Sequence, residues 1–378
     1  MSDLTSWEKR YDPDTQHARL ATAADLADPT ANIACAYNNT GEMHMLVKDM
    51  PIPQTGEVLL RVRATGICES DVHLWEKGGP GSTHLTTQVG AGRESGGEVI
   101  ALGKGVSWQI GDRVAIEEGI PCGRFDCDSC LRAIYDQCPN IGFHLSPPYN
   151  GTMTRYKIYP GYWLHRLPDS VGWDEGALCE PLAVALAALE SADVRLGNEV
   201  LICGAGPIGL LVLLCARACG AHPIIMTDLQ PSRLEFARTL VPSVLTVLST
   251  GDDSTGKETA SRVREHAQVV AAIECTGAES SIATAVYSCQ PRGCVVVVGS
   301  GLPRPSYPFK FAVLMEIKME FLLGYAHQFP RALRVLEGGV IDVKPLVTHR
   351  FPLARAVEGF KTAKDLKEGA IKVQIVDE

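Results

Sequence analysis

The sequence lacks both an excess of basic residues and an unbroken apolar run of membrane length. Its 378 residues hold 35 Lys and Arg against 44 Asp and Glu, which gives a net charge of −9. Because a nucleic-acid-binding surface needs clustered positive charge, this balance argues against nucleic acid as a partner. The apolar stretch Val200–Cys215 is interrupted by glycines and a proline and is shorter than a bilayer span, so we expect no membrane partner.

We expect no secretory signal peptide, and the sequence shows no internal repeat. It has thirteen cysteines, many of which lie in apolar, strand-like segments. We therefore expect reduced thiols and a cytoplasmic location rather than a secreted disulfide protein. A chain of 378 residues that is 46% hydrophobic is too long for one ordinary core, which predicts two domains.

The pattern of the chain changes along its length and divides it into segments. Residues 1–30 are polar and acidic and are predicted to form a flexible tail, with a helical arm over a partner subunit as the alternative. Residues 31–181 alternate short apolar runs with turns, which predicts a β-rich domain that residues 324–378 rejoin. Residues 182–323 alternate apolar strands with amphipathic helices, which predicts an α/β domain with a doubly wound parallel sheet. Its expected strands are Val200–Cys203, Pro223–Thr227, Val269–Glu274 and Gly293–Gly299.

A glycine-rich turn directly follows the first of these strands and precedes a helical segment. In the pattern GxGxxG, its residues include Gly204, Gly206, Pro207, Ile208 and Gly209. Glycines allow a tight turn and the close approach of a pyrophosphate, and the helix N-terminus offers free N–H groups to the phosphates. This context predicts a dinucleotide-binding site.

A carboxylate at the end of the next strand favours NAD over NADP. Asp228 lies 24 residues after Gly204, where it can accept hydrogen bonds from the ribose hydroxyls and repel a 2′-phosphate. Arg233 lies nearby and weakens this preference, and the alternative role for Asp228 is that of a helix cap. Small residues at the ends of later strands are expected to line the nicotinamide half of the site; these are Cys275, Thr276, Val298, Gly299 and Ser300.

Four cysteines gather in a loop rich in Gly, Asp and Arg. Cys122, Cys127, Cys130 and Cys138 follow the spacing C-x4-C-x2-C-x7-C. Four thiolates satisfy tetrahedral zinc and leave no open position, which predicts a structural zinc site. The alternatives are four unrelated free thiols or a pair of disulfides.

Together these features resemble the zinc-containing medium-chain dehydrogenases, and more narrowly the sorbitol, xylitol and L-arabinitol dehydrogenases. Besides the glycine turn and the cysteine loop, the resemblance is carried by Gly66–Cys68, Ser70–His73, Gly111–Glu117, Glu180–Leu182 and Val347–Leu353. It implies an α/β protein in which a GroES-like, β-rich catalytic domain accompanies a Rossmann NAD-binding domain. It also implies a homodimer or homotetramer joined through Rossmann strands, for which Gly293–Val298 and Pro303–Phe309 are the candidate edges.

The resemblance further implies a set of catalytic residues. A zinc ion would sit on Cys68, position 93 and Glu94, with Glu180 close by. Ser70 would relay the substrate proton, and His73 would join that relay or bind ribose. The zinc would polarise the substrate oxygen while hydride passes to or from the nicotinamide.

Position 93 departs from this pattern, because Arg93 stands where the family has a zinc-binding histidine. A guanidinium stays protonated in proteins and cannot ligate zinc. We therefore expect the catalytic zinc to be lost and Arg93 to neutralise one or both of Glu94 and Glu180 in its place. The alternative is a solvated Arg93 that points out of the pocket.

Three further departures affect the same predicted pocket. Glu69 adds a carboxylate next to Cys68, Leu74 replaces an aromatic residue, and Gly324-Tyr325 replaces an Arg-Tyr pair that contacts polyols in the family. The loss of hydrogen-bond donors and of side-chain volume in the pocket indicates a substrate that is larger or less hydroxylated than a pentitol.

The function expected first is NAD(H)-dependent hydride transfer to or from a small molecule that carries a secondary alcohol, a ketone or an activated carbonyl. Without zinc, Arg93 or Ser70 must donate a hydrogen bond to the carbonyl oxygen, which favours reduction of an activated carbonyl. Two alternatives stay open. One is a non-redox cyclase, lyase or isomerase with a structural dinucleotide, and the other is a catalytically silent binding subunit.

Overall fold

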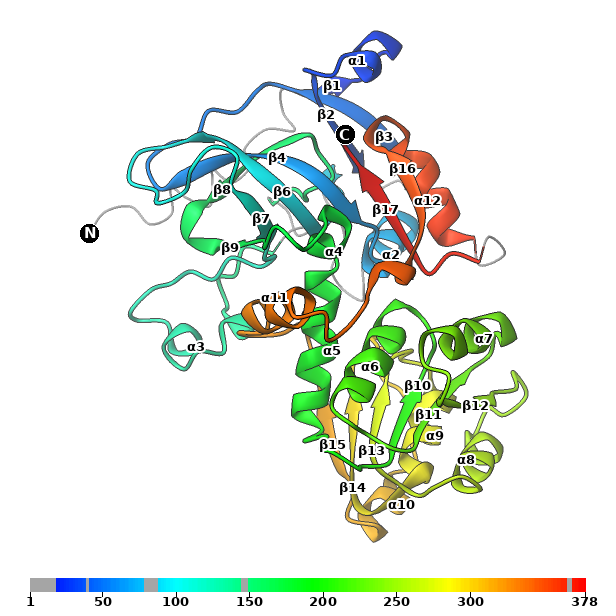
Figure 1. Cartoon of the computed structure of the whole chain (residues 1–378). Coiled ribbons are helices and arrows are strands. Elements are labelled where there is room, and N and C mark those ends of the chain that lie inside the picture. The colour runs from blue at the N-terminus through cyan, green and yellow to red at the C-terminus, as the bar shows by residue number, and fades with distance from the viewer. Residues whose placement is uncertain (1–17, 39–40, 78–87, 144–148, 366–368) are drawn as a thin grey trace. The chain divides into compact units, whose positions relative to one another are not determined.

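The computed structural model describes residues 18–38, 41–77, 88–143, 149–365 and 369–378, and the chain divides into two compact units (Figure 1). The first unit comprises residues 1–180 and 347–378, and the second comprises residues 181–346. The expected change of domain near residue 181 therefore lies within one residue of the observed boundary.

The expected return to the first unit at residue 324 was placed too early. Helix α11 (Phe329–Glu337) belongs to the second unit, since Gln328 and Arg331 both donate to Oε2 of Glu190 in helix α5 (Cys179–Ser191). The chain rejoins the first unit only at Val347, where strand β16 begins.

The first unit is the β-rich, GroES-like one. Its larger sheet has the strand order β16-β17-β4-β6-β7-β9, with β8 paired to β4, and its smaller sheet has the order β1-β3-β2-β5. The strands are β1 (Arg19–Leu20), β2 (Asn32–Tyr37), β3 (Met43–Lys48), β4 (Glu57–Gly66), β5 (Val89–Gly90), β6 (Glu94–Leu102), β7 (Arg113–Ile116), β8 (Tyr156–Pro160), β9 (Leu164–Arg166), β16 (Val347–Pro352) and β17 (Lys372–Val376). Its helices are α1 (Ala23–Ala27), α2 (Glu69–Lys77), α3 (Asp128–Leu131), α4 (Trp173–Ala177) and α12 (Ala356–Lys364).

The start of the described chain is ordered, so the flexible tail predicted for residues 1–30 is wrong for part of that range. Strand β1 pairs with β3, and helix α1 begins at a capping box in which Thr22 and Asp25 satisfy each other's backbone N–H groups. Arg19 donates two hydrogen bonds of 2.6 Å to Asp25 and so ties the strand to the helix. Residues 1–17 lie outside the described residues.

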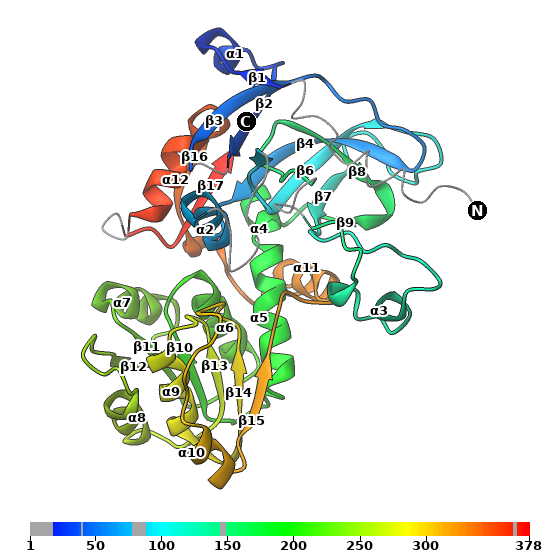
Figure 2. The ribbon, with the colours of Figure 1, turned by 180° about the vertical axis from the view of Figure 1, so that it is seen from behind.

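The strand near the C-terminus is central to the larger sheet. Strand β17 lies between β16, to which it is parallel, and β4, to which it is antiparallel. Helix α12 lies alongside β16 and β17, as the view from behind shows (Figure 2). Because β4 also pairs with β6, residues from three distant parts of the sequence meet where β4 ends at Gly66.

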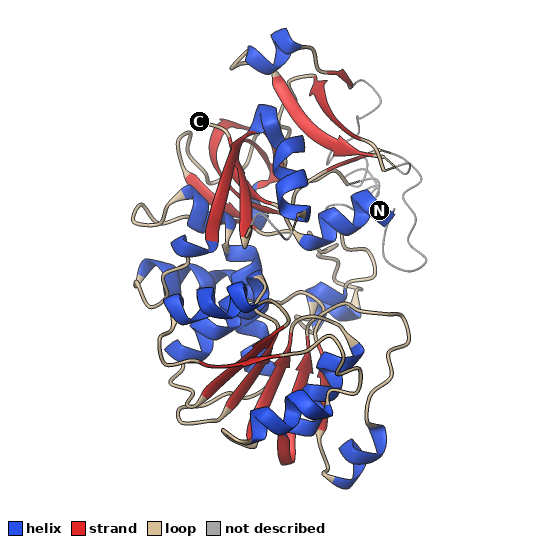
Figure 3. Ribbon diagram, turned by 90° about the vertical axis from the view of Figure 1, so that its right-hand side faces the viewer, coloured by secondary structure: helices blue, strands red, loops and turns tan. Residues whose placement is uncertain are grey.

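The second unit is a Rossmann-like α/β domain. Its six strands are parallel in the order β12-β11-β10-β13-β14-β15, and helices lie on both sides of them (Figure 3). The strands are β10 (Val200–Cys203), β11 (Ile224–Asp228), β12 (Leu245–Leu248), β13 (Val269–Glu274), β14 (Cys289–Val297) and β15 (Lys318–Phe321). The helices are α6 (Pro207–Ala218), α7 (Pro231–Leu240), α8 (Lys257–Arg264), α9 (Glu279–Ser288) and α10 (Phe309–Leu314), followed by α11. The inner strand β10 is fully buried, as its unbroken apolar sequence predicts.

The order of these strands corrects one expectation. Gly293–Val298 was a candidate edge for subunit contact, but β14 lies inside the sheet between β13 and β15. The edge strand on that side is β15. Within the described part of the chain, no helix is both long enough and apolar enough to span a bilayer.

Candidate active site

Cys68 and Arg93 meet at the end of β4. Strand β4 leads through Gly66 to Cys68, and Arg93 directly precedes β6, whose first residue Glu94 pairs with Gly66. A methyl group at Gly66 would lie 2.2 Å from Glu94 Oε2, so glycine leaves room for that carboxylate. Arg93 Nη2 donates a hydrogen bond of 2.8 Å to Cys68 Sγ. The solvated Arg93 considered as an alternative is therefore wrong.

Burial and the surrounding groups keep this guanidinium charged and this thiol neutral. Burial lowers the pKa of Arg93, but Cys68, Glu180 and Asp71 raise it by more, so the net change is upward. Burial raises the pKa of the Cys68 thiol, and the opposing effect of Arg93 is smaller. The Nε atom of Arg93 is buried without a hydrogen-bond partner among the described residues.

Of the two carboxylates predicted as partners of Arg93, Glu94 is bound by Lys372 instead. Lys372 Nζ donates to both oxygens of Glu94, at 2.8 and 2.7 Å, and to the carbonyl oxygen of Ile67 at 3.2 Å. Both side chains are almost fully buried. Lys372 is the first residue of β17 and lies 278 residues from Glu94 in sequence, so local sequence patterns gave no sign of this ion pair.

A second buried carboxylate, Asp71, lies beside Arg93. Its Oδ1 accepts a hydrogen bond of 2.9 Å from the N–H of Gly92, whereas its Oδ2 is buried without a partner among the described residues. Burial raises the pKa of Asp71 to about 6, against the lowering effect of the Gly92 N–H and Arg93. The hydroxyls of Ser70 and Tyr37 are likewise buried without a described partner. Sequence reasoning missed Asp71 although it follows Ser70 directly.

Glu180 completes the charged set from the first turn of α5. Its side chain is buried, and burial raises its pKa to about 7, with Arg93 acting in the opposite direction. Glu180 therefore gains or loses a proton near neutral pH. We call Cys68, Asp71, Arg93, Glu94, Glu180 and Lys372 the Arg93 cluster.

The Arg93 cluster does not fit a catalytic zinc ion. The histidine expected from the resemblance is absent, the thiol carries a guanidinium, and both oxygens of Glu94 are bound to an ammonium group. Among the residues that the structure describes, the only close group of three or more Cys, His, Asp or Glu ligand atoms lies elsewhere. No chemical step is therefore assigned to zinc in this cluster.

Three neighbouring residues lie outside the Arg93 cluster. The Glu69 side chain is exposed and lies 3.6 Å from His73 Nε2, one turn along α2, so it offers no ligand beside Cys68. His73 is part-exposed, and its role in proton relay or ribose binding stays a prediction. Leu74 is buried in the apolar core with Ile33 and Phe360, which fits a packing role for this residue.

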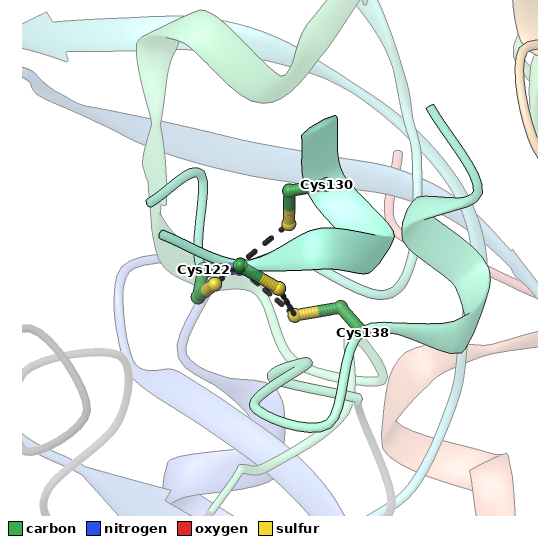
Figure 4. A group of neighbouring side chains, drawn as sticks. Cys122, Cys130 and Cys138 are labelled. Carbon is green, nitrogen blue, oxygen red and sulfur yellow. Dashed lines mark hydrogen bonds between the residues drawn. The ribbon is translucent and has the colours of Figure 1, made fainter. Parts of the chain in front are cut away.

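The four loop cysteines form the close ligand group. The distance between the Sγ atoms is 3.7 Å for Cys122 and Cys130 and 3.9 Å for Cys127 and Cys138, and all four lie within 4.8 Å of one another (Figure 4). Tetrahedral zinc with Zn–S bonds of about 2.3 Å requires sulfur atoms roughly 3.8 Å apart. The geometry therefore fits zinc, and all thirteen cysteines are free of disulfides. We call these four residues the cysteine quartet.

The glycine turn of the second unit fits a pyrophosphate. A methyl group at Gly209 would lie 1.8 Å from the carbonyl oxygen of Gly204, so packing alone demands glycine there. At Gly206, by contrast, a methyl group would meet nothing closer than Arg233 Nη1 at 3.8 Å. The fold itself leaves this space open at the N-terminus of α6, where Pro207 is the first helical residue and Ile208 the second.

Asp228 lies at the carboxyl end of β11, as predicted. Its Oδ2 accepts a hydrogen bond of 2.7 Å from the N–H of Ala205 in the glycine turn, and its Oδ1 accepts one of 2.8 Å from Gln230. These bonds fix the carboxylate beside the turn and leave further lone pairs for ribose hydroxyls. The alternative role of Asp228 as a helix cap is wrong, because the N-cap of α7 is Gln230 and no side chain caps the helix.

The loops after β13 and β14 hold the other predicted cofactor residues together. Glu274 is fully buried and accepts hydrogen bonds from the N–H and hydroxyl of Thr276 and from the N–H of Gly277. A methyl group at Gly299 would lie 2.1 Å from the Gly277 nitrogen, so the two loops touch through their backbones. The predicted residues Cys275, Val298 and Ser300 flank this contact; Glu274, which organises it, was missed as a site residue.

Comparison with known proteins gives matches over most of the chain. Residues 54–169 match the alcohol dehydrogenase GroES-like domain, and residues 207–338 match the zinc-binding dehydrogenase family. The chain is 46% identical to L-arabinitol 4-dehydrogenase from Hypocrea jecorina over 323 residues, which cover 85% of each chain. It is 39% identical to sorbitol dehydrogenase from Mus musculus, over 91% of this chain and 95% of that protein. The structure of L-idonate 5-dehydrogenase from Escherichia coli superposes with a TM-score of 0.83 at 26% identity, over 95% of this chain and 99% of that one.

Proposed function

Since this chain belongs to the polyol dehydrogenase branch of the zinc-containing medium-chain dehydrogenases, we propose that its NAD-dependent reaction moves hydride between a secondary alcohol and the corresponding ketone. The relatives named for L-arabinitol and sorbitol make a polyol or ketose the first substrate class to test. Gly324-Tyr325 replaces an Arg-Tyr pair that contacts polyols in the family, which implies weaker recognition of substrate hydroxyls. Less hydroxylated ketones are therefore the second substrate class to test.

We assign binding of the dinucleotide to the second unit. Gly204, Gly206 and Gly209 would cradle the pyrophosphate, and the open space at Gly206 is the observation that carries this assignment. Asp228 would accept from the ribose hydroxyls and so favour NAD over NADP, with Arg233 moderating that preference. When bound, the nicotinamide supplies or accepts the hydride.

We assign to the first unit the residues that bind the substrate oxygen, and none of them uses a catalytic zinc. Arg93 presents a fixed positive charge, and its Nε–H has no described partner, so it can donate to a carbonyl oxygen. The Ser70 hydroxyl is a second candidate donor, and Glu180, with a pKa of about 7, can hold or release a proton at neutral pH. A donor that stabilises developing negative charge on oxygen favours carbonyl reduction.

Zinc is assigned to the cysteine quartet as a structural ion, because its sulfur spacing fits tetrahedral coordination. The thirteen free cysteines support a reducing, cytoplasmic setting. We assign the contact surface of a homo-oligomer to the edge strand β15, where Phe321 and the following Leu323 are large, apolar and exposed.

Absorbance of NADH tests the reaction directly. The purified protein is incubated with NADH and a panel of ketoses, simple ketones and enones, and with NAD and the matching polyols. We expect NADH consumption with a ketone, and a loss of about 10²–10³-fold in kcat for Arg93→Gln, as for removal of one oxyanion donor. Arg195→Gln is the matched control, since Arg195 is exposed and its guanidinium pairs with Asp193 on the surface of the second unit. Substrate conversion without any change in NADH would instead select a non-redox enzyme, and binding without conversion would select a silent subunit.

A further inference from the structure

Glu274, the last residue of β13, is a fully buried carboxylate, and every hydrogen bond described for its side chain comes from an uncharged donor. Its Oε1 accepts from the N–H of Thr276 at 2.8 Å, and from the hydroxyls of Thr276 and Ser281 at 2.6 and 2.7 Å. Its Oε2 accepts from the N–H of Gly277 at 2.9 Å. Because two of these donors are backbone N–H groups of the loop after β13, the carboxylate fixes the course of that loop.

The carbonyl oxygen of Glu274 holds a second loop. It accepts hydrogen bonds from the N–H of Val298 at 2.8 Å and from the N–H of Gly299 at 3.1 Å, both in the loop after β14. A methyl group at Gly301 would lie 1.8 Å from the carbonyl oxygen of Gly277, so the two loops meet with no room for a side chain between them. One residue therefore fixes two loops whose backbones are in contact.

The loop after β13 also touches the glycine turn. A methyl group at Gly204 would lie 2.6 Å from Cγ2 of Thr276, and the N–H of Cys275 donates a hydrogen bond of 2.9 Å to the carbonyl oxygen of Cys203. The loops after β10, β13 and β14 therefore meet at one place, beside the turn to which the pyrophosphate is assigned.

The order of the strands determines which half of a dinucleotide these loops face. Asp228, assigned to the adenosine ribose, ends β11 on one side of β10, whereas β13 and β14 follow on the other side. With the pyrophosphate at the glycine turn after β10, the second nucleoside must extend over the ends of β13 and β14.

We propose that Glu274 is a positioning residue that preforms the surface for the nicotinamide riboside half of the dinucleotide before any cofactor binds. The proposal rests on the dinucleotide site proposed above. Since Glu274 is fully buried, it acts through the backbones of the two loops and does not touch the ligand itself. Loops that are already ordered pay no ordering entropy when a ligand binds, so the affinity for this half of the cofactor depends on the carboxylate.

The test compares two ligands of the full-length protein: NADH, and ADP, which keeps the adenosine and pyrophosphate groups but lacks the nicotinamide riboside. In Glu274→Gln the amide oxygen can replace Oε1, but the amide NH₂ then faces the N–H of Gly277, and the loop must shift. Fluorescence titration of NADH should show a loss of affinity of about 10–100-fold, while calorimetry should show an ADP affinity within about threefold of wild type.

Glu265→Gln is the matched control, because Glu265 is exposed at the end of α8, and it should change neither affinity. Equal losses for NADH and ADP in Glu274→Gln, or no loss for either, would overturn the positioning role and leave the dinucleotide site in place. A wild-type protein that binds neither ligand would overturn both proposals.

Hydrogen exchange in the cofactor-free wild type tests the same proposal without a variant. The N–H groups of Thr276 and Gly277 donate to Glu274, so they should exchange at least about 10-fold more slowly than that of Leu302, for which the described residues provide no acceptor. In Glu274→Gln, the N–H of Gly277 should lose this protection. Exchange in wild type as fast as at Leu302 would show that the loops are not preformed, and would overturn the proposal even if the variant does not fold.

Discussion

The cysteine quartet and the Arg93 cluster are both built around thiols in the same unit, and they differ in what accompanies the sulfur atoms. In the quartet, four thiols lie within 4.8 Å of one another. In the Arg93 cluster, a thiol and three buried acids share their surroundings with Arg93 and Lys372. The two clusters therefore differ in whether protein cations are bound to their potential metal ligands. A protein cation in the same space neutralises the ligands and competes with the ion.

Breaking the quartet is expected to give the largest effect. Cys130→Ser should abolish zinc retention and lower the free energy of unfolding by on the order of 5 kcal/mol, because structural zinc contributes its binding energy to folding. Zinc analysis and chemical denaturation measure the two effects. Cys219→Ser is the control, since Cys219 is exposed and lies outside both sites. Unchanged zinc content in Cys130→Ser would show that the quartet does not hold the zinc.

Removing Lys372, the cation that binds Glu94, is expected to give the second-largest effect. Lys372→Met leaves a buried carboxylate without its partner and should cost about 3–5 kcal/mol in the free energy of unfolding. Adding Glu94→Gln removes the stranded charge and should restore much of that loss. Denaturation of the single and double variants provides the measurement, and an equal loss in both would show that the pair stabilises by packing rather than by charge.

The stability contribution of Asp71 is expected to depend on pH. Its pKa in the folded protein, about 6, exceeds the ordinary value of 3.8 because burial outweighs the help of Gly92 and Arg93, while Glu94 adds repulsion. The folded state then holds this proton where the unfolded state has released it. Stability from this group should therefore fall by on the order of 3 kcal/mol as pH rises from about 4 to about 6.

Asp71→Asn removes this titration and is compared with wild type by denaturation across that range. The variant should gain stability relative to wild type as pH rises. A difference that stays constant with pH would show that Asp71 has an ordinary pKa.

The smallest effect is expected at Glu69. It is adjacent to Cys68 in sequence, but its side chain is exposed and its one described ionic partner is His73 at 3.6 Å. Glu69→Gln should change the free energy of unfolding by no more than about 0.5 kcal/mol and leave zinc content unchanged. A larger change in thermal or chemical denaturation would mean that this carboxylate acts on the Arg93 cluster from outside.

Features that rest on local sequence were predictable, and the fold shows why. The glycine turn, Asp228 and the quartet each depend on residues close together in the chain, where spacing alone limits the geometry. The α/β class and the strands of the second unit followed from apolar periodicity in the same way. The substitution at position 93 was visible because the neighbouring residues define what belongs there.

Features that rest on pairing between distant segments were not predictable. Lys372 meets Glu94 only because β17 and β6 both pair with β4. The sheet order placed β15, not β14, at the edge, and contacts to Glu190 held α11 in the second unit. The capping box of Thr22 and Asp25 was overlooked, because the polar, acidic composition of residues 1–30 was taken to indicate a flexible tail.

The ion pair of Lys372 with Glu94 also has a consequence for biosynthesis. Glu94 emerges from the ribosome long before its partner, because 278 residues separate them. Until Lys372 is made and β17 joins the sheet, closing β4 against β6 would bury a carboxylate without a counter-charge, at a cost of several kcal/mol. The nascent first unit should therefore stay open until Lys372 has been translated, and chains that terminate before that residue should be good substrates for chaperones and proteases.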